Sequence, residues 1–184
     1  MMVLITGGSG SGKSEIAENI AVTLHSKADS KKLYYLATML PYGREAGERI
    51  KKHRKMRSFK GFSTREVYYD LADFAEENIK GSTCLLECLG NLTANEMFEK
   101  GEKNCSDKIY KGLLLLSEKA ENLVVVTNDV FCSGAAYSKE TLDYMAQLGK
   151  LNRTAALAAD IVIQAQCGLP VFFKGENKKN EIMA

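Results

Sequence analysis

The 184-residue chain lacks tryptophan, has only two prolines and contains no apolar run near the roughly 18 to 20 residues that a membrane-spanning helix needs. Its five cysteines are odd in number and suggest no paired framework, which is typical of a protein from a reducing compartment. The first residues lack the cationic segment and cleavage site of a signal peptide. These absences predict a cytoplasmic protein without a membrane span.

A zinc site is also not indicated. Cys84 and Cys88 are close in the sequence, but no second pair of cysteines or histidines completes a zinc-binding set. The five cysteines (Cys84, Cys88, Cys105, Cys132 and Cys167) are therefore expected to be small buried side chains.

Charge is almost balanced, with 25 Lys+Arg against 23 Asp+Glu and a formal net charge of +2. So small a net charge argues against general nucleic-acid binding. The positive charge is nevertheless uneven, because seven cations fall between Arg44 and Arg57. The length favours one compact domain over residues 1–184, in which the polar segment 175–184 is expected to be a frayed tail.

Short apolar runs alternate with longer helical patterns, which is typical of βαβ units and a mostly parallel sheet covered on both faces. The expected strands are 2–6, 32–38, 83–88, 123–127 and 161–164, with 171–174 as an edge strand. The expected helices lie near 13–24, 44–56, 70–79, 107–119 and 139–158. In the last helix, Ser138 is the expected N-cap and the apolar stripe is Leu142, Met145, Leu148, Leu151 and Ala155. The sequence thus predicts an α/β fold.

The strongest motif is a phosphate loop between the first strand and the first helix. It consists of Gly7, Gly8, Ser9, Gly10, Ser11, Gly12, Lys13 and Ser14, and it fits the pattern Gly, four residues, Gly-Lys-Ser. Backbone N–H groups of such a loop bind phosphate at a helix N-terminus. Lys13 would then reach the β- and γ-phosphates, and the Ser14 hydroxyl would bind Mg²⁺. The alternative is a glycine-rich turn that binds nothing.

Two polar clusters follow predicted strands and should lie at the same sheet edge as the phosphate loop. Glu87 ends the third predicted strand and is the expected acidic residue that orients the metal, unless it is simply the first polar residue after a strand. Asn128 and Asp129 follow the fourth predicted strand, where they either line the site or cap a loop.

The cationic segment contains a second candidate for chemistry, His53. Read as a helix, the segment places Ala46, Ile50, His53 and Arg57 on one face, so the histidine points toward the protein or a cleft. Neighbouring cations lower the pKa of an imidazole, and a neutral imidazole beside a triphosphate can attack phosphorus. A purely structural histidine remains the alternative.

Together these motifs resemble the adenosylcobinamide kinase/adenosylcobinamide-phosphate guanylyltransferase family. The most specific match is the pattern Arg49-Ile50-x-x-His53-Arg54-x-x-Arg57 after the phosphate loop. Further matches are 35–38, 85–88, 126–130 and 149–153, in the family's order from residue 2 to about residue 174.

The resemblance implies a RecA-like P-loop NTPase fold and a bifunctional enzyme of cobalamin nucleotide-loop assembly. Such an enzyme phosphorylates adenosylcobinamide with ATP or GTP, then transfers GMP from GTP to adenosylcobinamide phosphate and releases pyrophosphate. The family passes through a guanylylated histidine, which matches His53, and its members form homo-oligomers, commonly trimers. The implied nucleotide contacts are the loop from Gly7 to Ser14, and Ala37, Thr38, Met39, Arg54, Lys55, Met56, Arg57, Glu66 and Glu87. In this family reading, Glu87 would either position Mg²⁺ or recognise the guanine.

Two other functions stay open from the sequence. A monofunctional P-loop small-molecule kinase would transfer the γ-phosphate without a covalent intermediate and would not need His53. A non-enzymatic nucleotide-binding switch or assembly subunit would bind nucleotide with negligible turnover, although the lack of a recognisable guanine-specifying Asn-Lys-x-Asp motif argues against a GTPase switch.

Overall fold

The computed structural model describes residues 1–28, 32–77, 79–131, 134 and 136–183; within them, the side chains at 44–46, 49, 52, 53 and 56 lie outside the description. The strands are β1 (Met2–Thr6), β2 (Leu33–Ala37), β3 (Ser63–Glu66), β4 (Thr83–Glu87), β5 (Asn122–Val126), β6 (Ile161–Gln166) and β7 (Leu169–Lys174). The helices are α1 (Lys13–Lys27), α2 (Gly43–Arg57), α3 (Leu71–Glu76), α4 (Leu89–Ala94), α5 (Cys105–Lys119), α6 (Lys139–Ala158) and α7 (Lys179–Ile182). A π-helical turn, η1 (Asn95–Glu99), and a 3-10 turn, η2 (Glu176–Lys178), complete the elements.

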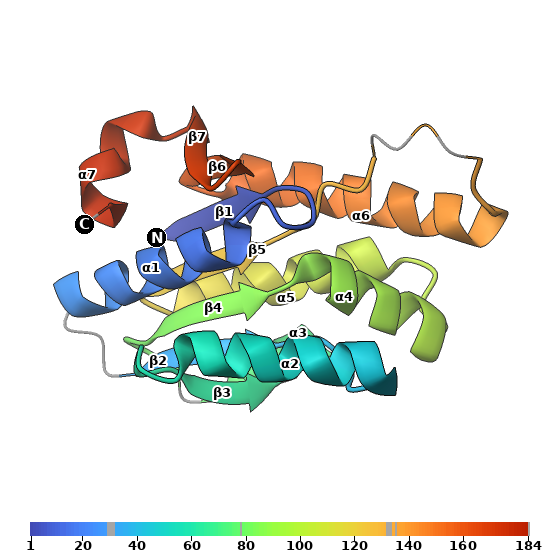
Figure 1. The fold of residues 1–184 in the computed structure, drawn as a ribbon, viewed down its shortest axis with the longest axis horizontal. Helices are drawn as coiled ribbons and strands as arrows, with labels where there is room; N and C mark the ends of the chain where they lie inside the picture. The colour runs from blue at the N-terminus through green and yellow to red at the C-terminus, as the bar shows by residue number, and fades with distance from the viewer. Residues whose placement is uncertain (29–31, 78, 132–133, 135, 184) are drawn as a thin grey trace.

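All seven strands belong to one sheet in the order β3-β2-β4-β5-β1-β6-β7. Strands β1 to β6 pair in parallel, and β7 pairs antiparallel with β6 at one edge. The order places β5 between β1, which leads into the phosphate loop, and β4, which ends in Glu87. Because these strands are parallel, their carboxyl ends meet along one edge of the sheet (Figure 1).

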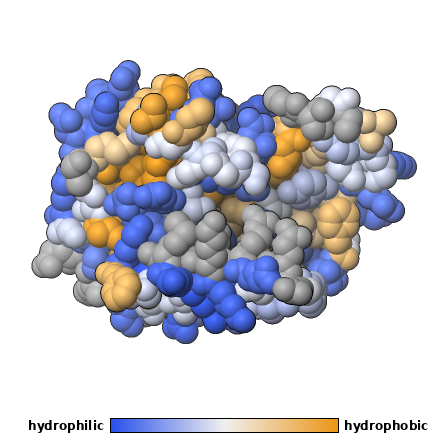
Figure 2. All heavy atoms as spheres, viewed as in Figure 1, coloured by the Kyte–Doolittle hydropathy of each residue, from blue (hydrophilic) through white to orange (hydrophobic). Residues whose placement is uncertain are grey.

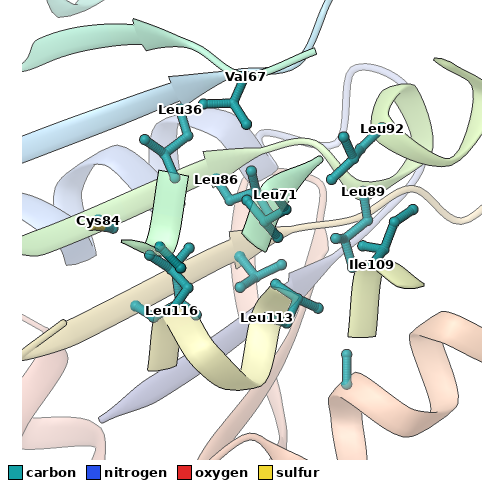
Figure 3. Close-up of a cluster of buried hydrophobic side chains, with 14 of the residues drawn as sticks. Leu36, Val67, Leu71, Cys84, Leu86, Leu89, Leu92, Ile109, Leu113 and Leu116 are labelled. Atoms are coloured by element: carbon teal, nitrogen blue, oxygen red, sulfur yellow. The ribbon is translucent and has the colours of Figure 1, made fainter. Parts of the chain in front are cut away.

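Alternate residues of each strand enter two separate cores, as expected for strands buried on both faces. Leu4, Leu36 and Leu86 face α3, α4, α5 and α6, where they join a cluster that includes Leu113 and Leu116 (Figure 3). The residues of opposite parity face α1 and α7 in the second cluster. The predicted α/β fold with a mostly parallel sheet and helices on both faces is therefore confirmed.

The sequence does not predict strand β3, helix α4 or the turn η1, and it does not predict the C-terminal elements η2 and α7. Strand β3 is polar, exposed and has no apolar alternation, so its pairing with β2 at the sheet edge carries no periodic signal. Helix α4 directly follows β4, where the sequence analysis placed no helix.

The apolar stripe of α6 is only partly buried. Ser138 is the N-cap and accepts a hydrogen bond from the Thr141 backbone N–H, as predicted. Leu148, Leu151 and Ala155 are buried, whereas Leu142 is exposed. The N-terminal part of α6 extends past the carboxyl edge of the sheet and so has less of the core to cover (Figure 1).

The expectation for cysteine burial was right in part. Cys84, Cys88 and Cys105 are free and buried, and burial raises the pKa of Cys84 to about 12 and that of Cys88 to about 11. Cys167 is instead exposed in the β6–β7 turn, and Cys132 lies outside the described residues. No helix in the described part of the chain is both long and apolar enough to cross a bilayer.

The C-terminal segment differs from the frayed tail expected for residues 175–184. It forms η2 and α7, and the Ile182 side chain is buried in the core on the α1 face. Lys27 of α1 donates hydrogen bonds to the carbonyl oxygens of Asn180 and Glu181. The buried Ile182, the partly buried Met183 and the polar contacts of Lys27 and Lys178 thus hold a polar segment in place.

Replacing the Ile182 side chain tests whether the C-terminal segment contributes to the stability of the protein. We expect Ile182→Ala to lower the free energy of unfolding by about 2 kcal/mol or more, because it removes buried methyl groups and leaves a cavity. Urea unfolding followed by circular dichroism measures the change, with the exposed Glu181→Ala as the control. Equal stability of the two variants would contradict the packing described here.

Candidate functional site

A cavity of about 830 Å³ opens at the carboxyl edge of the sheet. Its lining residues come from the phosphate loop and the start of α1, from β2 and β4, and from α2, β3 and the segment after β5. They include Ser9, Gly10, Ser11, Gly12, Lys13, Ser14, Ala37, Met39, Arg54, Arg57, Glu66, Glu87 and Asn128. This volume suits a small-molecule ligand, because such sites measure roughly 300 to 1,000 Å³.

The phosphate loop is held against the β6–β7 turn. Gly12 has a φ of +89° and begins α1, and a Cβ placed on it would lie 3.0 Å from the Gly168 Cα. The Gly168 backbone N–H donates to the Ser11 carbonyl oxygen at 3.0 Å. Gly7 is equally confined, because its Cβ would lie 2.9 Å from the Ala165 carbonyl oxygen. Glycine is therefore required at position 12 by both conformation and space, and at position 7 by space.

The loop brings the predicted lysine, serine and glutamate together. Lys13 curls over the loop and donates from Nζ to the Gly8 carbonyl oxygen at 2.8 Å. The Ser14 hydroxyl donates to Glu87 Oε1 at 2.5 Å, which joins the start of α1 to the end of β4. Three of the residues expected to handle phosphate and metal thus meet in one cleft.

Ser14 and Glu87 provide a site that fits Mg²⁺. The ion prefers oxygen ligands and usually takes only one or two from protein, with water and phosphate oxygens completing its shell. The hydroxyl and carboxylate oxygens are in contact. Among the described residues, no group of three or more histidine, cysteine or acidic side chains gathers into a metal-binding set. A hydroxyl and a carboxylate together match the one or two protein oxygens that Mg²⁺ usually takes.

Tyr35 links Glu87 to the end of α2. Its hydroxyl donates to Glu87 Oε2 at 3.0 Å, and the Arg57 guanidinium lies 3.6 Å from the centroid of its ring. Burial, followed by the nearby Glu87 carboxylate, raises the pKa of Tyr35 far above its usual range, so the phenol stays protonated. Arg57 is itself buried, and its Nη1 has no hydrogen-bond partner within the described structure. Such a desolvated cation–π contact is worth about 2 kcal/mol.

The α2 and β3 side of the cleft is more exposed. Arg54 donates to Glu66 Oε1 at 3.3 Å, and both side chains are largely exposed to solvent. A smaller cavity of about 300 Å³ adjoins the first and shares Arg54, Arg57 and Glu66 with it. Thr64 lines both cavities as well, so the two spaces meet between α2 and β3.

Several predicted residues do not line the large cavity. Gly7, Gly8 and Lys55 are absent from its described lining. Thr38 is also absent; it is buried, and its hydroxyl accepts from the Cys88 N–H at 2.6 Å. Thr38 therefore holds the end of β2 to the end of β4 without lining the cavity.

The side chains of His53 and Met56 lie outside the described residues, although both positions belong to helix α2. Ile50 and Arg57, the two described members of the predicted α2 face, line the cavity. Ala46, the remaining member, also has no described side chain.

Asn128 and Asp129 are neighbours in the sequence but have different contacts in the structure. Asn128 lines the cavity, which is the first of the two alternatives left open for it by the sequence. The Asp129 backbone N–H instead donates to the Gly7 carbonyl oxygen at 3.1 Å, which supports the start of the phosphate loop.

Sequence reasoning missed Tyr35 and Gly168. Strand parity could have indicated Tyr35, because it precedes Ala37 by two residues and Ala37 pairs with Glu87. Gly168 follows Gln166 and Cys167 at the β6–β7 turn. No sequence motif there predicts its contact with a loop more than 150 residues earlier.

Comparison with known proteins places these observations in a family. The family model described as "Cobinamide kinase / cobinamide phosphate guanyltransferase" matches residues 3–173. The bifunctional adenosylcobalamin biosynthesis protein CobU of Escherichia coli is 27% identical, over 95% of this chain and all of its own length. The Salmonella typhimurium CobU is also 27% identical, with the same coverage, and the Pseudomonas aeruginosa CobP is 26% identical over 96% of this chain and 99% of its own.

Among solved structures, a KaiC-like protein from Pyrococcus horikoshii OT3 aligns with a TM-score of 0.46 and 12% identity. The alignment covers 89% of this chain and 71% of that protein.

The confinement of the phosphate loop yields a direct test. Gly12→Ala and Gly10→Ala both place a side chain at positive φ, which costs about 1 to 2 kcal/mol. Only the first also meets backbone, because space around Gly10 is open within 4 Å. We expect Gly12→Ala to lower the free energy of unfolding by about 1 kcal/mol or more beyond the loss in Gly10→Ala.

Chemical denaturation of both variants measures this difference. The same loss in both would show that positive φ alone explains the cost and that the contact with Gly168 is unimportant.

Proposed function

The chain belongs to the cobinamide kinase/cobinamide phosphate guanyltransferase family of cobalamin biosynthesis, and from this premise we propose that the cavity at the carboxyl edge of its sheet carries out both reactions. The first reaction would transfer the γ-phosphate of ATP or GTP to the aminopropanol hydroxyl of adenosylcobinamide. The second would transfer GMP from GTP to adenosylcobinamide phosphate. The observation that carries the proposal is the meeting of the phosphate loop, Glu87 and α2 around one cavity.

The phosphate loop supports triphosphate binding. Its backbone N–H groups and the N-terminus of α1 favour anionic oxygens, and Lys13 adds a positive charge beside them. Ser14 and Glu87 would hold Mg²⁺, which would neutralise charge on the phosphate oxygens. Arg54 and Arg57 also line the cavity, where planar guanidinium groups can pair with phosphate oxygens.

His53 would be the nucleophile of guanylyl transfer. It lies three residues after Ile50 and four before Arg57, and both of these line the cavity from α2. An imidazole nitrogen would attack the α-phosphorus of GTP, forming a P–N bond while the bond to the departing pyrophosphate breaks. A phosphate oxygen of the cobinamide phosphate would then attack the same phosphorus and release the histidine.

The covalent step predicts a protein adduct. Incubation with α-labelled GTP and Mg²⁺ should give a labelled, acid-labile and base-stable protein, because a phosphoramidate is stable in base and is hydrolysed in acid. The label should disappear in His53→Asn. Electrophoresis and intact-protein mass spectrometry measure it.

His25→Asn is the matched control, because His25 lies on α1 and is not among the residues that line the cavity. Label that persists in His53→Asn, or that is lost equally in both variants, would exclude His53 as the nucleophile. Release of the label by adenosylcobinamide phosphate, with formation of adenosylcobinamide-GDP, would test the second half of the reaction. A monofunctional kinase would instead show only γ-phosphate transfer.

We further propose that the chain forms a homo-oligomer, with a trimer as the expected state. Residues Leu169, Val171 and Phe173 of β7 are exposed. They have opposite parity to Phe172, which packs on the α1 face. Leu157 of α6 is 75% exposed, and apolar side chains gather over the region of β7 (Figure 2). Uncovered apolar surface of this kind favours protein association.

Phe173→Asp should therefore weaken association, because it places a charge within the apolar surface. Multi-angle light scattering at several protein concentrations measures the mass of wild type and variant. Phe59→Asp is the control, since Phe59 is 98% exposed in the turn after α2. A monomeric wild type, or the same mass for the wild type and Phe173→Asp, would contradict this surface as the interface.

A further inference from the structure

Tyr35 occupies a position that simple core packing does not explain. Its ring packs edge-on against Phe62 at a centroid distance of 5.9 Å, and phenylalanine would make the same contact. Its hydroxyl does something phenylalanine cannot do, because it donates to Glu87 Oε2 at 3.0 Å. The neighbouring Tyr34 packs similarly against Phe74 on the opposite sheet face.

The two oxygens of Glu87 have different partners. Oε2 accepts from Tyr35, and Oε1 accepts from Ser14. If the Glu87 side chain rotated freely, Oε1 and Oε2 would exchange places and the carboxylate would turn out of the cleft. The hydrogen bond from a buried phenol selects one orientation, because the phenol has Glu87 as its acceptor inside a nearly closed environment.

Arg57 extends this link to α2. Its guanidinium lies over the Tyr35 ring, 3.6 Å from the centroid. A cation over the ring face draws electron density from the phenol and makes its O–H a better donor to a carboxylate. The contact also ties the last residue of α2 to β2, so the helix that carries His53 and the carboxylate on β4 share one support.

We propose that Tyr35 is a positioning residue, which holds the Glu87 carboxylate with Oε1 toward Ser14 and couples that orientation to α2 through Arg57. The inference rests on the proposed metal-binding role of Glu87. It adds a residue that does not touch the metal itself and acts only through the carboxylate. A carboxylate already fixed in place loses little freedom when Mg²⁺ and nucleotide bind.

Equilibrium binding tests the proposal without relying on turnover. Isothermal titration uses a GTP analogue with a methylene group between the α- and β-phosphorus atoms, which cannot form the covalent adduct, with excess Mg²⁺ and again in EDTA. We expect Tyr35→Phe to weaken Mg²⁺-dependent binding of this analogue about tenfold, because it removes a hydrogen bond to a charged group. Binding of the analogue in EDTA should stay within about twofold, since the phosphate loop is unchanged.

Tyr34→Phe is the matched control, because Tyr34 lies on the same strand with the same burial and faces away from the site. It should leave both affinities within about twofold. Glu87→Gln should lose at least as much Mg²⁺-dependent affinity as Tyr35→Phe. In the double variant Tyr35→Phe/Glu87→Gln, the losses of Mg²⁺-dependent affinity should not add, because Tyr35 acts only through Glu87.

Three outcomes would overturn the inference. Wild-type Mg²⁺-dependent binding in Tyr35→Phe would show that the hydroxyl is unimportant, and additive losses in the double variant would show that it acts elsewhere. Unchanged binding in Glu87→Gln would remove both this inference and the proposed role of Glu87. None of these results touches the labelling of His53, so the proposed guanylyl transfer is judged separately.

Discussion

The close approach of the phosphate loop to the β6–β7 turn is the constraint on which the site depends. Gly12 and Gly168 meet at a distance that leaves no room for a side chain, and the Ser11 carbonyl is fixed by the Gly168 N–H. The start of α1 follows directly, so its dipole and free N–H groups are aimed by the same contact. A turn far along the chain thus helps to fix the position of the phosphate loop.

The strand order explains why the contact between the phosphate loop and Glu87 runs through Ser14 of α1 and not through neighbouring strands. Strand β5 separates β1 from β4, so the end of β4 is not adjacent to the strand that enters the phosphate loop. Helix α1 crosses this gap, and Ser14 in its first turn contacts Glu87. From Glu87 the polar contacts continue through Tyr35 to Arg57, so one connected set of side chains joins α1, β4, β2 and α2. Movement of any of these elements would disturb the same carboxylate.

The sequence predicted those parts of the molecule in which local pattern and structure agree. The phosphate loop, the buried strands and the N-cap Ser138 each carry their signal within a few residues. Strand β3 could not be found this way, because its edge position needs no apolar face. The packing of Ile182 depends on α1, and the role of Gly168 depends on the phosphate loop, so neither follows from neighbouring residues. Tyr34 and Tyr35 look alike in sequence and differ only in the sheet face that each enters.

The net charge of the chain does not describe the charge of the cleft. The cations between Arg44 and Arg57 appear in the sequence as one block, but the structure separates those it describes by helix face. Arg57 is buried over an aromatic ring, Arg54 pairs with Glu66 at the cavity, and Lys55 is exposed away from the cavity lining. A net charge of +2 therefore says little about the cleft. Its potential comes from how α2 distributes its cations between cleft and solvent, and the contact of Arg57 with Tyr35 fixes that distribution at one end of the helix.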